Sequence, residues 1–360
     1  MIKNIQYKKL GEICDFVSGG TPSKSKNEYW KNGNIPWIKI SDFKEKYIKC
    51  SDEKITKNGL ENSSAKLLKK GTILYTIFAS VGKVAILDIE ATTNQAIVGV
   101  NLKENNLVDK DFLYYFLCSI ENNIKKQARG VAQNNNNINI SILKNVCIPI
   151  LPISSQKNIV KTLMRLEDIL ENFKQKQILI NFLSKSLFTT MFGTPEYNEK
   201  GWNFISLKDI SYSKGEYGSN KPAINYNGGY RYIRITDINA NGELKTEKVG
   251  VSDEKIEAQK YRLKENDILF ARSGATVGKN FLYNKKYGKC IFAGYLIRFK
   301  LNPHLVSTKY LKIYLDTNYY WNWVKNCQNI VAQPNINAKQ YGEDLKIMLP
   351  PIELQNKFAE

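Results

Sequence analysis

The chain has 360 residues, of which 42% are apolar and 24% charged, and its formal net charge is +19. No stretch reaches the roughly 18 consecutive apolar residues of a membrane span, the first ten residues lack the apolar run of a signal peptide, and the six cysteines form no C-x-x-C pair. These features argue against a membrane protein, a disulfide framework and a zinc site, and they predict a cytoplasmic, reduced protein of about two domains with a polyanionic partner, nucleic acid before membrane surface.

The first 150 residues alternate short β-branched and aromatic runs with breaks rich in Gly, Asn, Asp and Ser. That pattern predicts strands at residues 35–40, 71–77, 84–89 and 96–102. A helix is expected over residues 109–128, "DKDFLYYFLCSIENNIKKQA", because apolar residues recur there at steps of three and four. This part of the chain therefore has mixed α and β character.

Residues 154–192 carry the most regular pattern of the sequence. Positions separated alternately by four and three residues form a seam in which all but Gln177 and Ser184 are apolar: Ile159, Leu163, Leu166, Leu170, Phe173, Gln177, Ile180, Ser184, Leu187 and Met191. Such a seam is typical of a coiled coil. Ser154 or Ser155 can cap the start, and Gly193 followed by Pro195 can end the helix. We expect one helix of about 37 residues whose seam is covered by a partner helix; packing on its own domain is the alternative.

The remaining residues repeat the first part at offsets of 195 to 201. "WIKISDF" at 37–43 returns as "YIRITDI" at 232–238, and "SDEKI" occurs at 51–55 and 252–256. Four further pairs keep the same order: 8–20 with 205–218, 67–83 with 262–279, 131–139 with 331–337, and 150–159 with 349–358. Strands are expected at 230–235, 267–272 and 295–301, and a helix at 307–327. The fold class that follows is α+β, with two duplicated mixed α/β domains joined by a long coiled-coil helix.

Two duplicated basic domains, each followed by a Pro-x-x-x-Gln helix start, resemble the specificity subunit of type I restriction–modification systems. The phrases "WIKISDF", "KKGTILYTIFASVGK" and "LPISSQKNIV", with their second copies, carry the resemblance along nearly the whole chain. It implies a target recognition domain at 1–152, a central spacer helix at 153–193, a second recognition domain at 194–350 and the start of a distal helix at 351–360. In that family the two helices pair; here the distal one stops after about two turns, so we expect a methyltransferase subunit or a second copy of this chain to cover the seam. A shortened gene product is the alternative.

The resemblance also implies partners and cofactors. Each domain would read one half of a bipartite site in double-stranded DNA, and the helices would dock methyltransferase subunits, and possibly restriction subunits. S-adenosylmethionine, ATP and Mg²⁺ are expected on those partner subunits and none in this chain. Self-association through the central helix is expected when no partner is present.

Polar residues beside the predicted strands are the candidates for DNA contact, with readout expected where the two copies differ. Solvated surface side chains are the competing interpretation for each. In the first copy they are Thr21, Ser23, Lys24, Lys26, Lys39, Ser41, Ser80, Lys83, Asn134, Asn135 and Asn136. In the second copy they are Lys214, Lys221, Arg231, Arg234, Thr236, Arg272, Ser273 and Lys279.

Catalytic motifs are not recognisable. "SGATVGKN" at 273–280 has three residues between its glycines where a phosphate loop has four, and an Asn where Ser or Thr would bind Mg²⁺. The single histidine, His304, lies in a loop-like "LNPHLV". The sequence predicts a non-catalytic DNA-recognition subunit; the alternatives are a self-contained restriction or modification enzyme and a basic RNA-binding or scaffold protein.

Overall fold

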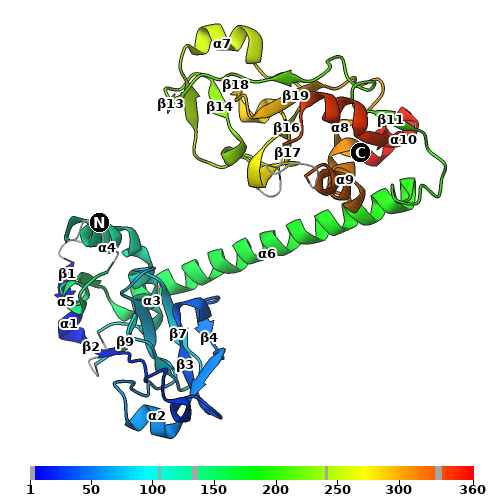
Figure 1. Ribbon diagram of the computed structural model, residues 1–360. Coiled ribbons are helices and arrows are strands. Elements are labelled where there is room, and N and C mark those ends of the chain that lie inside the picture. Colours follow the sequence, from blue (N-terminus) through cyan, green and yellow to red (C-terminus); the bar gives the residue numbers. More distant parts are fainter. Residues whose placement is uncertain (1–4, 104–106, 132–136, 240–241, 329–334) are drawn as a thin grey trace. The chain divides into compact units, whose positions relative to one another are not determined.

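The computed structural model describes residues 5–103, 107–131, 137–239, 242–328 and 335–360 (Figure 1). Spatial clustering divides the chain into two units, residues 1–173 and 174–360, which we call the N-terminal and C-terminal domains. The boundary falls inside the helix α6 (Ile153–Phe192), which therefore contributes to both. The sequence-derived bounds, with the helix as a separate spacer, remain a prediction.

The N-terminal domain is built on two sheets and a strand pair that joins its ends. The strand pair is antiparallel, β1 (Gln6–Lys9) with β10 (Cys147–Ile150). The larger sheet has the order β2 (Cys14–Ser18), β9 (Ile97–Leu102), β6 (Ile73–Thr76), β7 (Val84–Leu87), β4 (Tyr47–Ile48), and the smaller one β5 (Glu53–Ile55), β3 (Ile35–Ile38), β8 (Thr92–Thr93). Its helices are α1 (Leu10–Ile13), α2 (Lys57–Glu61), α3 (Lys110–Ser119), α4 (Glu121–Val131) and α5 (Ile140–Lys144).

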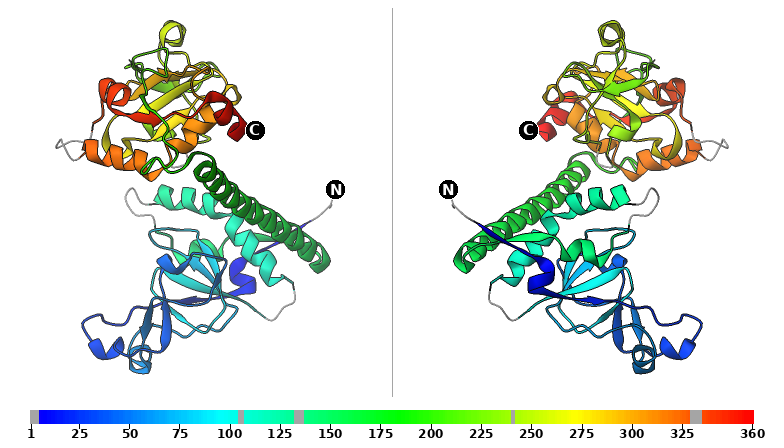
Figure 2. Two further views of the ribbon diagram at one scale, coloured as in Figure 1. Left: turned by 90° about the vertical axis from the view of Figure 1, so that its right-hand side faces the viewer. Right: turned by 90° about the vertical axis from the view of Figure 1, so that its left-hand side faces the viewer.

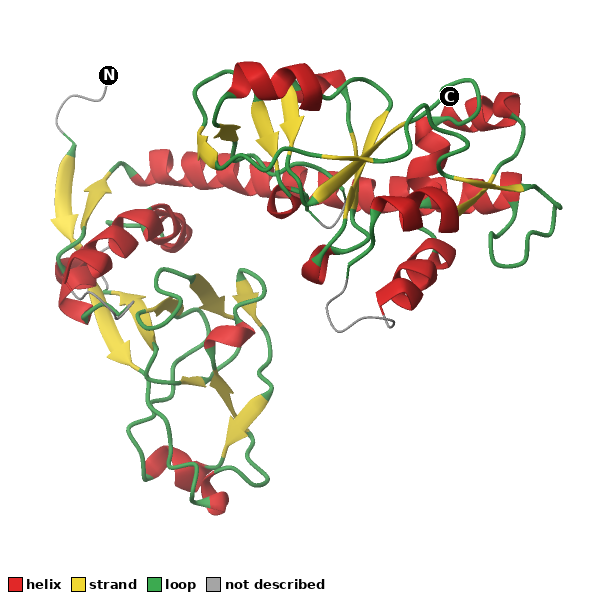
Figure 3. Ribbon diagram, turned by 45° about the horizontal axis from the view of Figure 1, so that its top comes forward, coloured by secondary structure: helices red, strands yellow, loops and turns green. Residues whose placement is uncertain are grey.

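The C-terminal domain repeats this plan with small changes. Its joining pair is β11 (Phe204–Ser206) with β20 (Lys346–Met348), and its main sheet has the order β12 (Glu216–Tyr217), β19 (Leu296–Lys300), β16 (Asp267–Ala271), β17 (Asn280–Leu282). Parallel strands β14 (Arg231–Ile233) and β18 (Cys290–Phe292) and antiparallel strands β13 (Ala223–Asn225) and β15 (Val249–Val251) complete it. Its helices are α7 (Glu254–Tyr261), α8 (Thr308–Tyr314), α9 (Asn318–Gln328) and α10 (Ile352–Ala359). Figure 3 shows strands and helices mixed in both domains, which confirms the predicted α+β class and duplication.

The repeated phrases "WIKISDF" and "YIRITDI" form the same turn. In each, a strand leads into a single helical turn, Ile40–Asp42 or Ile235–Asp237, whose aspartate accepts a hydrogen bond from a backbone N–H three residues earlier. The N···O distances are 2.7 Å from Lys39 to Asp42 and 2.9 Å from Arg234 to Asp237. Both aspartates are buried, so the bond also satisfies a desolvated carboxylate. The phrase recurs because this turn requires an aspartate that accepts a hydrogen bond from the backbone N–H three residues earlier.

The Pro-x-x-x-Gln phrase also has a structural reason. Gln156 and Gln355 are fully buried at the starts of α6 and α10. The Gln156 amide accepts a hydrogen bond from the Asp109 N–H at 2.8 Å and donates to the Leu107 carbonyl at 2.8 Å. Gln355 makes the equivalent bonds to the Ser307 N–H at 2.9 Å and the Leu305 carbonyl at 3.2 Å. Each glutamine therefore ties the start of a helix to the segment that precedes α3 or α8.

The central helix is continuous from Ile153 to Phe192, as the sequence predicts, and Figure 2 shows it unbroken from two further sides. At about 1.5 Å per residue it is about 60 Å long. Its first turns pack Val160 into the core of the N-terminal domain, and its last turns pack Phe188 and Phe192 into the core of the C-terminal domain. Gly193 ends it with φ +79°, the left-handed conformation expected of a helix stop. No helix of the described residues is long and apolar enough to cross a membrane.

Candidate nucleic-acid interface

Hydrogen bonds establish which residues of the two domains are equivalent. In the N-terminal domain the Ile77 N–H donates to the Ala96 carbonyl at 2.8 Å, and the Ile77 carbonyl accepts from Ile138 at 2.9 Å. In the C-terminal domain Arg272 occupies the place of Ile77: its N–H donates to the Tyr295 carbonyl at 3.1 Å and its carbonyl accepts from Ile336 at 2.9 Å. Position 77 therefore corresponds to 272, and position 96 to 295.

Four of the residues predicted to contact DNA lie around one pocket of the C-terminal domain. The pocket has a volume of about 790 Å³ and lies beside the β14 turn and the start of β19. Its walls include Lys221, Arg234, Thr236 and Arg272, which the sequence singled out, and Asn220, Tyr232 and Tyr295, which it did not. Three cationic side chains around one open hollow make a site suited to a polyanion.

Arg272 is the best-positioned of these side chains. Its guanidinium carbon lies 4.9 Å from the centre of the Tyr217 ring, a cation–π arrangement. The Tyr217 hydroxyl in turn accepts a hydrogen bond from the Ala338 N–H at 3.1 Å, which fixes the ring. The Arg272 Nε atom is buried and has no hydrogen-bond partner among the described residues. The Tyr217 ring therefore positions a guanidinium whose Nε atom has no hydrogen-bond partner among the described residues.

The other cations of this pocket have acidic partners. The Lys221 ammonium lies 2.9 Å from an Asp253 oxygen. Arg234 donates to both carboxylate oxygens of Asp237, at 2.8 and 3.0 Å, and this pairing raises the pKa of Arg234 further above its usual value. A paired guanidinium still has free N–H groups, so Arg234 can reach a phosphate without losing Asp237.

Arg231 lies outside this pocket, and its buried guanidinium stabilises the fold. It is only 6% exposed, and its Nη2 donates to the carbonyls of Lys245 and Glu247, the latter at 3.2 Å. Lys214 lines a second pocket with Tyr217 and Lys339, and Lys279 lines a third with Lys312. Ser273, whose carbonyl accepts from the Thr276 hydroxyl at 3.2 Å, shapes the turn after β16.

In the N-terminal domain the predicted residues form two groups. Thr21 donates to the Gln95 side chain, next to the position that corresponds to Tyr295. Lys24 and Lys39 both pair with Glu53, whose pKa they lower, and the Lys24 ammonium also lies 3.4 Å from the centre of the Trp30 ring.

The remaining predicted residues of this domain surround these groups or lie apart. Lys26 bonds the Tyr29 hydroxyl at 3.0 Å, Ser23 bonds Ser25 at 2.8 Å, and Ser41 is exposed. Ser80 and Lys83 belong to the turn between β6 and β7, where the Lys83 N–H donates to the Thr76 hydroxyl at 2.9 Å. Asn134, Asn135 and Asn136 lie outside the described residues.

Sequence reasoning missed the aromatic residues of the C-terminal pocket. Tyr295 is 62% exposed in the wall of the pocket, and Tyr217, which the Arg272 guanidinium contacts, is 43% exposed. The available signal was the replacement of Ala96 by Tyr295 and of Ser18 by Tyr217 at corresponding strand ends, as the pairing of β2 with β9 and of β12 with β19 aligns them. Reading it requires the register of those strands, which the sequence alone does not supply.

The predicted seam of α6 is largely uncovered. Leu166, Leu170, Phe173 and Ile180 are 51 to 66% exposed, Ile159 38% and Leu187 43%, while Leu163 and Met191 are half-buried. Six further exposed apolar residues of α6 lie outside the seam and were not predicted: Met164, Ile169, Ile178, Leu179, Phe182 and Leu183. Exposed apolar surface on this scale marks an interaction site.

Comparison with known proteins gives this arrangement a family. The model of the type I restriction modification DNA specificity domain matches residues 2–181 and again residues 199–360. The type I restriction enzyme MjaIX specificity subunit of Methanocaldococcus jannaschii is 29% identical over 302 residues, which cover 76% of this chain and 67% of that protein. The EcoR124I/EcoR124II specificity subunit of Escherichia coli is 32% identical over 169 residues, 46% of this chain and 41% of that protein.

A solved structure shares the fold. The crystal structure of a type I restriction-modification system S subunit from M. genitalium covers 100% of this chain and 89% of its own, with a TM-score of 0.57 at 17% identity. The two family matches coincide with the two copies of the domain described above. The chain therefore belongs to the family of type I restriction modification DNA specificity domains and carries two of them.

Proposed function

We propose that this chain is the DNA-specificity subunit of a type I restriction–modification complex and that each domain reads one half of a bipartite site in duplex DNA. The observation that carries the proposal is the presence of two family domains with one backbone plan but different side chains around the same turn. Because both domains share one backbone arrangement, they should dock on DNA in the same way. Because their side chains differ, they should recognise two different half-sites.

Two kinds of contact contribute to DNA binding by such a subunit. Lysines and arginines neutralise phosphates and give affinity without sequence preference. Side chains at base edges then discriminate, at about 1–3 kcal/mol per wrong base pair. Because both domains are on one chain, binding of the first raises the effective concentration of the second, and affinity increases without new contacts.

Selection from a randomised duplex library tests this function. The full chain is incubated with the library at about 0.15 M salt, and the bound DNA is sequenced. We expect two short enriched blocks separated by a fixed number of unselected base pairs. Enrichment of a single block, or of none, contradicts the proposal; a preference for RNA of the same sequences in a competition assay favours the RNA-binding alternative.

We further propose that the exposed apolar face of α6 is the docking surface for methyltransferase subunits and that it pairs with a second copy of the chain when these are absent. The six exposed apolar side chains of the seam, each worth about 1.5–3 kcal/mol on full burial, supply the driving force. Association driven by apolar burial persists at high salt, unlike association through surface charges.

Sedimentation of the full chain at 0.1 and 1 M NaCl tests this docking surface. We expect a dimer under both conditions and dissociation in Leu170→Glu. Asn172→Glu, which places the same charge on an exposed position of the same helix outside the seam, is the matched control and should remain dimeric. A monomer at both salt concentrations contradicts self-association.

The cofactors of the complex belong, in this proposal, to its other subunits. S-adenosylmethionine is assigned to the methyltransferase subunits, and ATP and Mg²⁺ to the restriction subunits. Equilibrium dialysis of the isolated chain against each ligand should show no binding. Saturable binding of S-adenosylmethionine to the isolated chain would instead support a self-contained modification enzyme.

A further inference from the structure

The two domains carry different side chains at one small set of equivalent positions. In the C-terminal domain Arg272 and Tyr295 line the pocket beside β19, and the Arg272 guanidinium lies over the ring of Tyr217. Strand register and shared hydrogen bonds place Ser18, Ile77 and Ala96 at the same positions in the N-terminal domain. A polar, a buried aliphatic and a small residue are thus replaced together by two rings and a guanidinium, while the backbone around them keeps the same hydrogen bonds.

The neighbouring segment extends this difference. The Trp37 ring N–H donates to the Gly20 carbonyl at 3.0 Å, and the Tyr232 hydroxyl donates to the Ser219 carbonyl at 2.7 Å, so Gly20 corresponds to Ser219. The next residues are Thr21 and Asn220. Thr21 bonds Gln95, whereas Gly294 occupies the place of Gln95 in the C-terminal domain. The backbone at these positions is therefore the same in both domains, while the polar side chains that it carries differ.

We propose that these equivalent positions are the specificity determinants of the two half-sites: Arg272 and Tyr295 with Asn220 in the C-terminal domain, and Thr21 and Gln95 in the N-terminal domain. This inference rests on the proposed function and assigns it to residues. Arg272 contacts the O6 and N7 atoms of a guanine in the major groove, and the Gln95 amide contacts an adenine.

The contact between Arg272 and the Tyr217 ring favours a directed contact with a base. A guanidinium held 4.9 Å from the centre of a fixed ring has fewer directions in which to present its N–H groups than a fully solvated arginine has. Tyr295 is 62% exposed beside it and offers a flat apolar wall. Ile77, only 5% exposed, provides no such group, so the N-terminal domain must discriminate through Thr21 and Gln95.

Library selection with exchanged residues tests the proposal. Arg272→Ile introduces the side chain that the N-terminal domain has at this position, and Arg272→Lys keeps the charge but removes the planar fork. For both variants we expect about a 10- to 100-fold loss of preference for guanine at one position of one half-site, with the other half-site unchanged. Gln95→Ala should do the same for an adenine in the opposite half-site.

The possible outcomes are distinct. A uniform loss of affinity for all sequences in Arg272→Ile, with the slope of log K against log salt smaller by about one, would make Arg272 a phosphate contact and overturn the proposal. Tyr295→Ala alters an exposed side chain and should weaken the same half-site, so the test remains valid should Arg272→Ile fail to fold. Failure of the unsubstituted chain to select two blocks would refute the proposed function itself, independently of these residues.

Discussion

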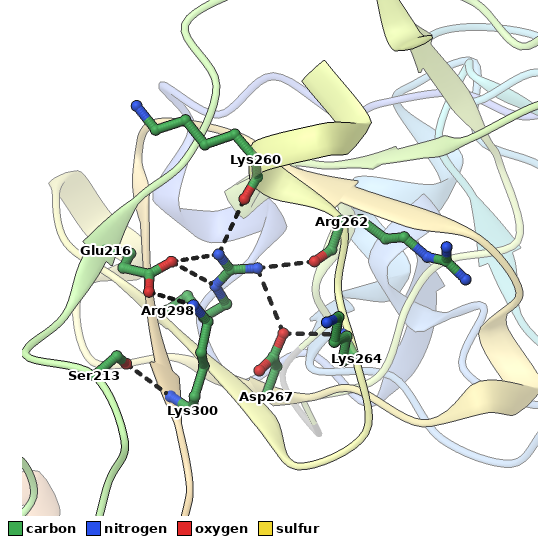
Figure 4. A network of polar contacts seen from close by, with 8 residues as sticks. All are labelled: Ser213, Glu216, Lys260, Arg262, Lys264, Asp267, Arg298 and Lys300. Carbon is green, nitrogen blue, oxygen red and sulfur yellow. Dashed lines mark hydrogen bonds and ion pairs between the residues drawn. The ribbon is translucent and has the colours of Figure 1, made fainter. Parts of the chain in front are cut away.

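The N-terminal and C-terminal domains carry different kinds of side chain at equivalent positions of their main sheets: uncharged in the first and charged in the second. Under β12 of the C-terminal domain lies an ion cluster in which Arg298 contacts Glu216 and Asp267 and also donates to the Arg262 carbonyl at 2.8 Å (Figure 4). The register of the main sheets places Val17, Gly99 and Thr72 at the positions of Glu216, Arg298 and Asp267. The same strands therefore accept a neutral or a charged interior.

The two domains fill the same interior space in different ways. Gly99 leaves space that the Leu68 and Thr72 side chains fill, at 3.0 and 3.1 Å from the site of a Cβ atom, whereas Arg298 fills that space itself and must then be neutralised. Burial raises the pKa of Asp267, although the Lys264 N–H and the Arg298 charge both oppose this. Burial acts in the same direction on Glu216, but hydrogen bonds from Lys300 and Arg298 outweigh it and the pKa of Glu216 is lowered.

The largest expected effect comes from breaking the ion cluster. Arg298→Met leaves Asp267 and Glu216 without their shared cation and should lower the free energy of unfolding of the C-terminal domain by about 3–5 kcal/mol. Native-state hydrogen exchange of the β16 and β19 amides measures this, and amides of β6 and β9 in the N-terminal domain should be unaffected.

The matched variant replaces the cluster with neutral residues. The triple substitution Glu216→Val, Asp267→Thr and Arg298→Met should recover most of the lost stability, because it removes the unpaired charges along with their partner. Equal stability of Arg298→Met and the unsubstituted chain would mean that the ion cluster does not contribute to the stability of the C-terminal domain.

A feature common to both domains should give equal effects. Gln156→Ala and Gln355→Ala each leave buried backbone groups without partners and should cost about 1–3 kcal/mol in their own domain. Gln177→Ala, an exposed glutamine of α6, is the control and should change stability by less than about 0.5 kcal/mol. A large loss for one buried glutamine and none for the other would show that the two helix starts are held differently.

The rate at which a reagent labels buried cysteine thiols allows the two domain cores to be compared in the unsubstituted chain. Burial raises the pKa of Cys14 to about 12 and that of Cys290 to about 11, so at pH 8 about 0.1% or less of either is thiolate. Cys50 and Cys147 are exposed. A thiol reagent at pH 8 should label Cys50 and Cys147 first, and Cys14 and Cys290 at the rate of unfolding. Rapid labelling of Cys14 or Cys290 in the folded chain would contradict the buried environment of that thiol.

The sequence predicted the duplication, the α+β class and the continuous central helix because each depends on local pattern or on repeated phrases. It could not predict where a repeated phrase changes structure. "SDEKI" contains the whole of β5 in the N-terminal domain, but in the C-terminal domain it forms a left-handed turn at Asp253 followed by the start of α7. The flanking strands differ, and tertiary pairing overrides the identical local sequence.

The candidate site was predictable only in part. Lys221, Arg234, Thr236 and Arg272 are polar residues beside predicted strands, and all of them line one pocket. Arg231 fitted the same rule, but its guanidinium faces the carbonyls of a neighbouring loop. Whether a strand arginine points inward or outward depends on long-range packing, as does the stacking of Arg272 on Tyr217, 55 residues away in the chain.

In the proposed function, the continuous helix α6 sets the number of base pairs between the two half-sites. Duplication of residues 174–180 inserts seven residues, keeps the seam in register and lengthens α6 by about 10 Å, the rise of about three base pairs. Library selection with this variant should return the same two half-sites with a spacer longer by up to about three base pairs. An unchanged spacer, or the loss of one half-site, would contradict the claim.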